Sequence, residues 1–371
     1  MDIFYDIDIY KGLVIFSMAL VFIYLVNGVC KCILLSRKPK KQEKEHHEGV
    51  SIVITANNRA EDIRENLTSF LEQDYPQFEV IIVDECSEDD TQDVLADFQE
   101  TYPHLRTTRI FPGAKFRSTK KLAINLGILA AKYDIVLFTQ ISSRPATPNW
   151  VRLMESYFTD KVSVVVGYAN FDADKKRDIP RIFRFRHFIE TFFLFKCKQY
   201  VSGEGFNMGC RKSSYLPQKV FSKNSHSYSG YDSDIVKALS KCGEVNVVKD
   251  TDAAILLNDN LRKTWGERMA YYYNNKRKWS SFTVFCSNYE LLLRWLIYGV
   301  SLCLISQKIW IEYNLIFLLL TFFMDLLIVN IYLKCLKQRK LLLTSLMINI
   351  FGFAYRWYYS IYSIFTNKKW R

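Results

Sequence analysis

Polar and acidic side chains follow two apolar runs near the start of this chain. Residues 52–54 read Ile-Val-Ile and lead into the polar turn 55–59, and the run 80–83 ends in Asp84 and Glu85. Carboxylates at the end of a buried strand can accept hydrogen bonds from ribose hydroxyls or from the edge of a base. In open α/β sheets, ligands bind just outside the carboxyl ends of the strands. The first chemistry that this chain suggests is therefore nucleotide binding.

A helical pattern separates the two apolar runs. Ile63, Leu67, Phe70 and Leu71 recur at the spacing of one helix face. Strand, helix and strand in this order predict a β-α-β unit, and both of its strands end in polar groups.

Four further motifs follow in order along the chain. They read KKLAINLGILAAKYDIVLFT, GEGFNMGCRKSSY, SGYDSDIV and YYYNNKRKW. With these motifs the region 49–280 resembles the family-two glycosyltransferases, inverting enzymes that use nucleotide-activated sugars. The resemblance implies an α/β sandwich of the glycosyltransferase A type, with helices on both sides of a mostly parallel sheet and with flanking membrane segments.

The resemblance implies that the groups at the first two strand ends bind the donor. The turn formed by Thr55, Ala56 and Asn57 would touch the nucleoside. Asp84 and Glu85 match a family Asp-Asp pair that reads a uridine-like base or the ribose. The alternative, from the residues alone, is that the acidic run after Asp84 only caps the next helix.

Lys120 and Lys121 open a helix that we predict over residues 120–131. In relatives a basic residue here faces the nucleotide. A cation about 4 Å from a phosphate contributes about 4 kcal/mol at an effective dielectric constant of about 20. The alternative is that both lysines lie on a solvated helix face.

The main departure from the family follows the next apolar run, 135–138. Relatives carry Asp-x-Asp there, whose carboxylates hold Mn²⁺ or Mg²⁺ against the diphosphate, whereas this chain has Gln140 and Ser142, which we assign to the donor site. Three interpretations stay open. In the first, the enzyme is metal-independent, and cations such as Arg144, Lys120 and Arg277 neutralise the diphosphate. In the second, one residual acid and the substrate hold a metal. In the third, the protein binds nucleotide without catalysis.

Asp232, in the motif SGYDSDI, is the candidate catalytic residue. Inverting transfer needs one base to deprotonate the acceptor hydroxyl as that hydroxyl attacks the anomeric carbon. Relatives have two acids here, of which the second is the base. Asp232 matches the second, and Tyr231 replaces the first. The alternative is that Asp232 is the N-cap of a helix over 233–239.

The resemblance assigns the acceptor to Gly205, Asn207 and Trp279. Gly205 and Asn207 belong to a loop whose glycines permit close approach of the backbone to a ligand. Arg277, two residues before Trp279, would contact the diphosphate. The alternative for this last motif is a basic collar that pairs with anionic lipid.

Apolar stretches flank the motif-bearing region. Those over 10–35, 288–305 and 311–333 are long enough to cross a bilayer, whereas 341–354 is short and predicts a re-entrant or interfacial helix. Basic residues follow the first and the third stretch, which places the catalytic region in the cytoplasm, at the inner membrane.

We therefore expect four parts along the chain. They are an N-terminal transmembrane segment (1–35), a basic polar linker (36–48), a glycosyltransferase domain (49–280) and a C-terminal membrane region (281–371).

Composition narrows the classes of partner. The 371 residues carry a net charge of +12 and nine scattered cysteines. Much of the positive charge flanks apolar segments, which favours a membrane partner, and no compact nucleic-acid-binding motif is present. The cysteines lack the pairing of a zinc site, so we predict reduced thiols and no protein metal ligands.

The sequence thus predicts a membrane-anchored inverting hexosyltransferase of cell-envelope polysaccharide biosynthesis. Its donor would be a nucleotide-sugar and its acceptor a lipid-linked or polysaccharide chain. One alternative is a catalytically silent homologue that binds nucleotide-sugar or a partner enzyme. The other is a membrane scaffold without a ligand.

Overall fold

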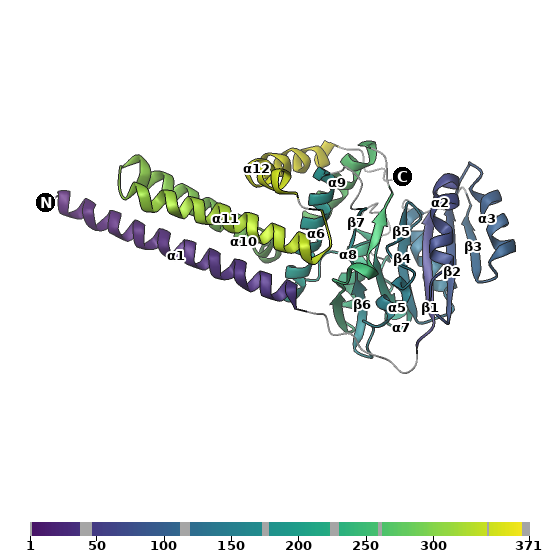
Figure 1. Cartoon of the computed structure of the whole chain (residues 1–371). Coiled ribbons are helices and arrows are strands. Elements are labelled where there is room, and N and C mark those ends of the chain that lie inside the picture. Colours follow the sequence, from purple (N-terminus) through teal and green to yellow (C-terminus); the bar gives the residue numbers. More distant parts are fainter. Residues whose placement is uncertain are drawn as a thin grey trace. The chain divides into compact units, whose positions relative to one another are not determined.

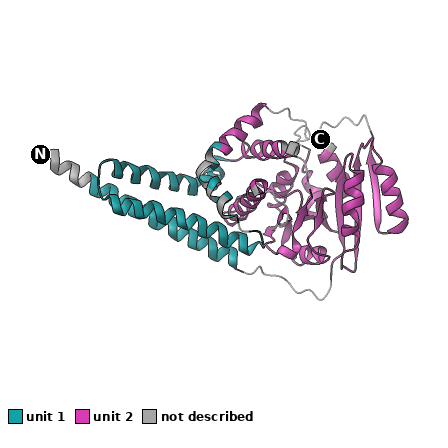
Figure 2. Ribbon diagram, turned by 45° about the horizontal axis from the view of Figure 1, so that its top comes forward, with its two compact units in different colours: residues 1–38, 280–354 teal, residues 39–279, 355–371 magenta. Residues whose placement is uncertain are grey.

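The computed structural model describes residues 2–37, 47–111, 119–172, 178–222, 230–258, 262–339 and 341–365. The chain divides into two compact units (Figure 2). Unit 1 contains residues 1–38 and 280–354, and unit 2 contains residues 39–279 and 355–371.

A seven-stranded mixed sheet forms the centre of unit 2, in the order β3-β2-β1-β4-β8-β6-β9 (Figure 1). The first four strands of this order are parallel, and β8 runs antiparallel to both of its neighbours. Every residue of β1 (Val50–Ala56) is buried. Strands covered on both faces read as continuous apolar runs, which explains the Val- and Ile-rich sequence of β1.

Helices cover both faces of this sheet. Ile63 and Leu67 of α2 (Ala60–Leu71) belong to the same buried cluster as Ile52 and Ile54. Val53 points to the opposite face, where a Cβ at Gly127 of α4 (Thr119–Ala130) would overlap its side chain. Gly127 thus allows α4 to pack closely on the sheet. The expected α/β sandwich with a mostly parallel sheet is confirmed.

The register of the parallel strands aligns the predicted donor residues. Ala56 of β1 pairs with Asp84 of β2 (Phe78–Glu85), and Thr55 pairs with Gln140 of β4 (Ile135–Gln140). Because the three strands are parallel neighbours, their carboxyl ends meet at one edge. This edge is where an open α/β sheet binds ligands.

The remaining elements of unit 2 complete the fold. The other strands of the main sheet are β3 (Leu105–Ile110), β6 (Val162–Val166), β8 (Met208–Arg211) and β9 (Glu244–Val247). A second sheet, in the order β5-β10-β7, contains β5 (Ser143–Pro145), β7 (Ala169–Phe171) and β10 (Ile255–Leu257). The other helices are α3 (Thr91–Thr101), α5 (Trp150–Glu155), α6 (Asp178–Lys196), α7 (Lys212–Tyr215), η1 (Leu216–Gln218), α8 (Tyr231–Leu239), η2 (Thr251–Ala253) and α9 (Arg262–Lys276).

Unit 1 is built from α1 (Asp2–Ser36), α10 (Ser281–Ser306) and α11 (Ile311–Cys335), each of which contacts the other two. The parts Tyr10–Ser36, Ser281–Ser306 and Ile311–Cys335 are long and apolar enough to cross a membrane. Large apolar side chains lie exposed on all three helices, for example Phe22, Leu302 and Phe323. The second stretch begins seven residues before the expected start at 288.

A last helix, α12 (Leu342–Phe365), covers the stretch expected to be re-entrant or interfacial. It runs for 24 residues, and the boundary between the two units falls within it. It is not among the three candidate spans. Its interfacial placement stays a prediction.

One polar cluster lies inside the apolar bundle of unit 1. Arg294 of α10 contacts Asp325 of α11 at 2.8 Å, and the Tyr24 hydroxyl of α1 donates a hydrogen bond to the same carboxylate. All three side chains are buried or half-buried. Charged groups in apolar helices are retained where they pair with one another, so this cluster fixes how the three helices pack.

We expect Arg294 and Asp325 to be energetically coupled. A double-mutant cycle with Arg294→Met and Asp325→Asn, followed by thermal unfolding of the purified protein in one detergent, should give a coupling of about 1 kcal/mol. Arg37→Met, at the exposed end of the α1 region, provides the control with Asp325→Asn. Additive effects for Arg294 and Asp325 would contradict the pairing.

Candidate functional site

Asp84, at the end of β2, is buried and accepts contacts on both carboxylate oxygens. Its Oδ1 accepts a hydrogen bond from the Ser87 backbone N–H at 3.0 Å, and its Oδ2 lies 3.1 Å from Gln92 Nε2 and 3.4 Å from Arg109 Nε. Each carboxylate oxygen can accept a second hydrogen bond. Asp84 therefore shapes the turn after β2, and its predicted contact with a base or ribose stays a prediction.

The acidic run after Asp84 does cap helices, through Asp89. Asp89 accepts hydrogen bonds from the backbone N–H of Ala60, the first residue of α2, and from that of Thr91, the first residue of α3. Glu85 has no part in this capping. Its backbone carbonyl accepts a hydrogen bond from Asn57, which joins the turns after β1 and β2.

Lys120 lies across the ends of β1 and β2. Its ammonium group donates a hydrogen bond to the Thr55 hydroxyl and lies 3.6 Å from Glu85 Oε1. Only 15% of its side chain is exposed. Burial lowers the pKa of Lys120, and the nearby Glu85 carboxylate opposes this effect. The ammonium group is therefore held by the same strand ends that carry the predicted donor residues.

Lys121 has a different environment from Lys120. Its ammonium group forms a 2.7 Å ion pair with Asp234 of α8, and only 3% of its side chain is exposed. Neither lysine lies on a solvated helix face. Lys121 ties α4 to α8, and its predicted contact with the donor stays a prediction.

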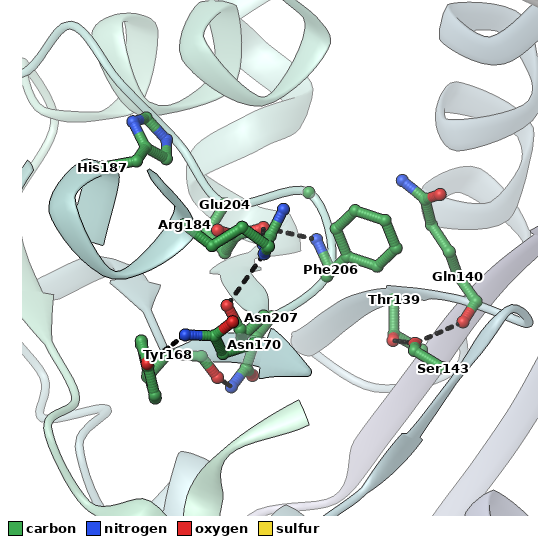
Figure 3. Close-up of polar contacts among 12 residues, drawn as sticks. Thr139, Gln140, Ser143, Tyr168, Asn170, Arg184, His187, Glu204, Phe206 and Asn207 are labelled. Atoms are coloured by element: carbon green, nitrogen blue, oxygen red, sulfur yellow. Dashed lines mark hydrogen bonds and ion pairs between the residues drawn. The ribbon is translucent and has the colours of Figure 1, made fainter. Parts of the chain in front are cut away.

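Gln140 and Ser142 occupy the turn after β4. The Gln140 side-chain amide donates a 3.4 Å hydrogen bond to the Tyr231 hydroxyl. The Gln140 carbonyl accepts one from the Ser143 hydroxyl at 2.6 Å, which Figure 3 shows. Ser142 is buried, and its carbonyl accepts a hydrogen bond from the Asn258 backbone. This turn is therefore held by neutral groups.

These groups do not fit a divalent cation. Hard cations such as Mn²⁺ and Mg²⁺ need carboxylate oxygens, and the turn offers an amide and a hydroxyl. Glu85, an acid at the end of β2, faces Lys120. Among the described residues, no group of three or more His, Cys, Asp or Glu side chains is arranged to hold a metal ion.

The loop 203–207 supports the start of α8. A Cβ at Gly203 would lie 2.7 Å from the carbonyl carbon of Asp232, and a Cβ at Gly205 would overlap the Tyr231 hydroxyl. The Tyr231 hydroxyl donates a 3.1 Å hydrogen bond to the Gly205 carbonyl. The two glycines are thus required because α8 packs directly on this loop.

Asn207 is a structural residue in this arrangement. Its side chain is fully buried and bonds to three partners: Trp150 at 3.0 Å, and the backbone carbonyls of Tyr168 and Ala253 at 2.8 Å each (Figure 3 shows the Tyr168 contact). The amide joins α5, the residue before β7, and η2, and its N–H groups have no capacity left for an acceptor sugar. A role of Gly205 towards the acceptor stays a prediction.

Asp232 is the second residue of α8, and Gly230 is the N-cap. The alternative N-cap role of Asp232 is therefore wrong. The carboxylate is buried, with 6% of the residue exposed. Its Oδ1 accepts hydrogen bonds from the Tyr271 hydroxyl at 2.7 Å and from the Ser233 backbone N–H at 2.8 Å. Among the described residues, no hydrogen bond reaches Oδ2, which leaves this oxygen available to accept a proton.

The environment of Asp232 favours proton uptake. Burial raises the pKa of the Asp232 carboxyl, the hydrogen bond from Tyr271 lowers it, and Glu204 raises it further. Glu204 is held in place by Arg184 at 2.7 Å (Figure 3). A base is most effective when its pKa lies near the working pH, so this environment suits a general base.

Tyr271 of α9 was missed by the sequence reasoning. It lies in the motif YYYNNKRKW, and the only signal was its position one helical turn before Asn275, which is buried. Three consecutive tyrosines gave no indication of which of them contacts Asp232. Packing of α9 on α8 makes that choice.

Arg277 and Trp279 lie apart from the contacts described above. Arg277 donates hydrogen bonds to the Ser360 carbonyl and, at 2.9 Å, to the Ser363 hydroxyl, both in α12. The Trp279 ring lies 5.1 Å from the Lys276 ammonium group. Neither contacts another predicted site residue within the described parts of the chain, so their assigned roles stay predictions.

Some of the predicted residues, together with Tyr231, do come together in two groups. Thr55, Glu85 and Lys120 form one group at the ends of β1 and β2. Gln140, Gly205, Tyr231 and Asp232 form a second, linked to the first because Thr55 and Gln140 are paired neighbours. The carboxylate is that of Asp232 on α8, and its Oδ2 can still accept a proton. The cation is Lys120, which lies at the ends of β1 and β2. This arrangement can bind an anionic nucleotide and deprotonate a hydroxyl.

Part of the chain is similar in sequence to known proteins. Residues 51–216 match the family model described as Glycosyl transferase family 2. A segment of 121 residues is 28% identical to the poly-beta-1,6-N-acetyl-D-glucosamine synthase of Staphylococcus epidermidis and covers 31% of this chain. The match spans only 28% of the length of that protein.

The structure also aligns with solved structures, of which the first named below shares the fold. The mannosyltransferase PcManGT from Pyrobaculum calidifontis, in complex with GDP-Man and Mn²⁺, aligns over 93% of this chain and 99% of its own, with 16% identity and a TM-score of 0.52. The S. aureus TarS 1–349 structure with UDP-GlcNAc aligns over 82% of this chain and 92% of its own, with 14% identity and a TM-score of 0.46.

Proposed function

We propose that the chain is an inverting glycosyltransferase that uses a nucleotide-sugar, because residues 51–216 match the family model described as Glycosyl transferase family 2. The acceptor in this proposal is a lipid-linked or polysaccharide chain. The observation that carries the proposal is the Asp232 carboxylate, buried beside the sheet edge with Oδ1 hydrogen-bonded and Oδ2 without a hydrogen bond among the described residues.

The reaction follows from the position of Asp232. Its Oδ2 takes the proton of the acceptor hydroxyl while the hydroxyl oxygen forms a bond to the anomeric carbon of the donor sugar. The bond from that carbon to the diphosphate oxygen breaks on the opposite face, and the nucleoside diphosphate leaves with the electron pair. A single displacement inverts the configuration. Tyr271 keeps the carboxylate oriented by holding Oδ1.

The donor occupies the ends of β1, β2 and β4 in this proposal. Thr55, Ala56 and Asn57 border the nucleoside, and Asp84 and Glu85 bind the base or the ribose. The alignment of these residues in register supports this placement. Gln140 and Ser142 line the same edge.

The membrane is part of the proposal. The three candidate spans in α1, α10 and α11 would anchor the protein as a multi-pass protein of the inner membrane. The basic residues that follow α1 and α11 support a cytoplasmic catalytic unit. An enzyme placed there meets cytoplasmic nucleotide-sugars and lipid-linked acceptors together.

A second candidate is a protein that binds nucleotide-sugar without turnover. The neutral turn at Gln140 and Ser142 favours it, because the usual carboxylate ligands for a metal are absent there. Asp232 argues against it, since its buried charge has a desolvation cost that binding alone does not require.

The test is a donor assay with the full-length protein purified in detergent. It should be incubated with a panel of UDP- and GDP-sugars and membrane lipid extract, and release of nucleoside diphosphate should be followed. Release with one donor supports the enzyme. Binding of a donor without release supports the silent homologue. Absence of nucleotide binding would reject both and leave the scaffold.

Tyr271→Phe should shift the pH dependence of transfer. Asp232 acts as a base only when ionised, so kcat/KM falls as the pH drops through its raised pKa. The hydrogen bond from Tyr271 stabilises the ionised form. Its removal raises the pKa further, and the acidic limb of the profile should move to higher pH.

The matched control for this shift is Tyr273→Phe on the same helix, because among the described residues the hydroxyl that bonds to Asp232 belongs to Tyr271. Its acidic limb should coincide with that of the unmodified protein. An unchanged limb in Tyr271→Phe would mean that a group other than Asp232 sets the profile.

A further inference from the structure

The charge at the strand ends differs from that expected for a metal-dependent site. The PcManGT structure, which shares this fold, contains Mn²⁺. In this chain Gln140, Ser142 and Tyr231 stand at three positions where the family resemblance expects acids. The leaving diphosphate still needs a positive charge beside it, because it gains negative charge as the bond to the sugar breaks.

Two of these replacements contact each other. The Gln140 amide donates to the Tyr231 hydroxyl, which in turn donates to the Gly205 carbonyl. Burial raises the pKa of Tyr231, so the phenol stays neutral. This neutral chain joins β4, the loop 203–207 and α8. Two carboxylates facing each other there would repel unless a cation lay between them, whereas an amide and a phenol hold the three elements together without one.

A fixed cation lies one strand away. Lys120 contacts Thr55 of β1 and Glu85 of β2, and Thr55 is the register partner of Gln140. Lys120 is also the second residue of α4, a helix of 12 residues whose N-terminal end carries a partial positive charge. Its low exposure keeps water from screening this charge.

We propose that the diphosphate of the donor is bound without a divalent cation and that the ammonium group of Lys120 neutralises it. The proposal rests on the proposed use of a nucleotide-sugar. The Gln140–Tyr231 pair then serves as a positioning element that replaces the metal-bridged carboxylates. Burial lowers the pKa of Lys120, and the Glu85 carboxylate, at 3.6 Å, opposes this effect by favouring the charged ammonium group.

The first test measures binding of UDP and GDP to the full-length protein by calorimetry. One series contains EDTA, and the others contain Mn²⁺ or Mg²⁺. The dissociation constant of the bound nucleotide should be the same in all three series. Binding that appears only with a divalent cation would overturn the proposal and leave the proposed function intact.

The second test compares Lys120→Met with Lys132→Met, which removes the same charge from an exposed position after α4. Lys120→Met should weaken binding of the diphosphate by about 10- to 100-fold, the range for a lost hydrogen bond to a charged group, and should leave binding of the free nucleoside unchanged. Lys120→Arg should restore part of the affinity, because it keeps the charge.

The outcomes distinguish failure of the Lys120 inference from failure of the proposed function. Equal loss of nucleoside and diphosphate binding in Lys120→Met would show a structural role and overturn the inference. Unchanged diphosphate affinity in that variant would overturn it as well. Failure of the unmodified protein to bind any nucleotide, with or without metal, would instead reject the proposed function.

Discussion

Asp232→Asn should lower the rate of sugar transfer by about 10²- to 10⁴-fold, the usual contribution of a general base. The amide has nearly the shape of the carboxylate, and its oxygen can still accept the hydrogen bonds from Tyr271 and Ser233. The variant loses only the ability to take up the acceptor proton. Nucleotide binding and thermal stability should therefore be preserved, since the strand ends are untouched.

The measurement is kcat for donor turnover beside a calorimetric dissociation constant for the nucleoside diphosphate. Asp160→Asn makes the same chemical change at an exposed site and should leave both values unchanged. Full turnover by Asp232→Asn would remove Asp232 from the chemistry. Parallel loss of binding and turnover would show that the residue supports the fold instead.

Gly203→Ala should also abolish most activity, by displacing the base without removing it. The added Cβ would lie 2.7 Å from the carbonyl carbon and 2.8 Å from the carbonyl oxygen of Asp232. Backbone atoms cannot rotate away as a side chain can, so the start of α8 must shift. A displacement of about 1 Å at a catalytic group costs about 10²-fold in rate.

The control for this variant is Gly299→Ala in α10, where a Cβ has no neighbour within 4 Å. It should have normal activity. Gly203→Ala should still bind nucleoside diphosphate, because Lys120 and Thr55 lie on other elements. Normal transfer by Gly203→Ala would contradict the packing of α8 on the loop 203–207.

Local patterns were sufficient to predict the elements of the sheet edge. The alternation of apolar runs with Ile63, Leu67 and Phe70 predicted a β-α-β unit, and those residues are buried against β1 and β2. Burial of apolar surface is the dominant force in folding, and the spacing of apolar residues along the sequence shows which face of an element is buried. The three apolar stretches that were expected to cross a membrane form the helices α1, α10 and α11 for the same reason.

The partners of polar side chains could not be predicted in this way. Asn207 and Arg277 are of the residue types expected to contact a ligand. The Asn207 side chain is instead hydrogen-bonded within the core, and Arg277 is hydrogen-bonded to α12. A side-chain hydrogen bond depends on which distant elements pack together, and the local spacing of apolar residues does not indicate this.

The amino-acid sequence by itself thus predicted the β-α-β unit and its polar strand ends, because these depend on residue types and short spacings, whereas Asp232 became the candidate base through the resemblance of its motif to a family. Tertiary structure alone decided that Tyr271 holds Asp232, that Gln140 meets Tyr231 and that Lys120 spans β1 and β2. Those contacts join residues 39, 91 and 65 positions apart, and only packing of the elements brings such residues within bonding distance.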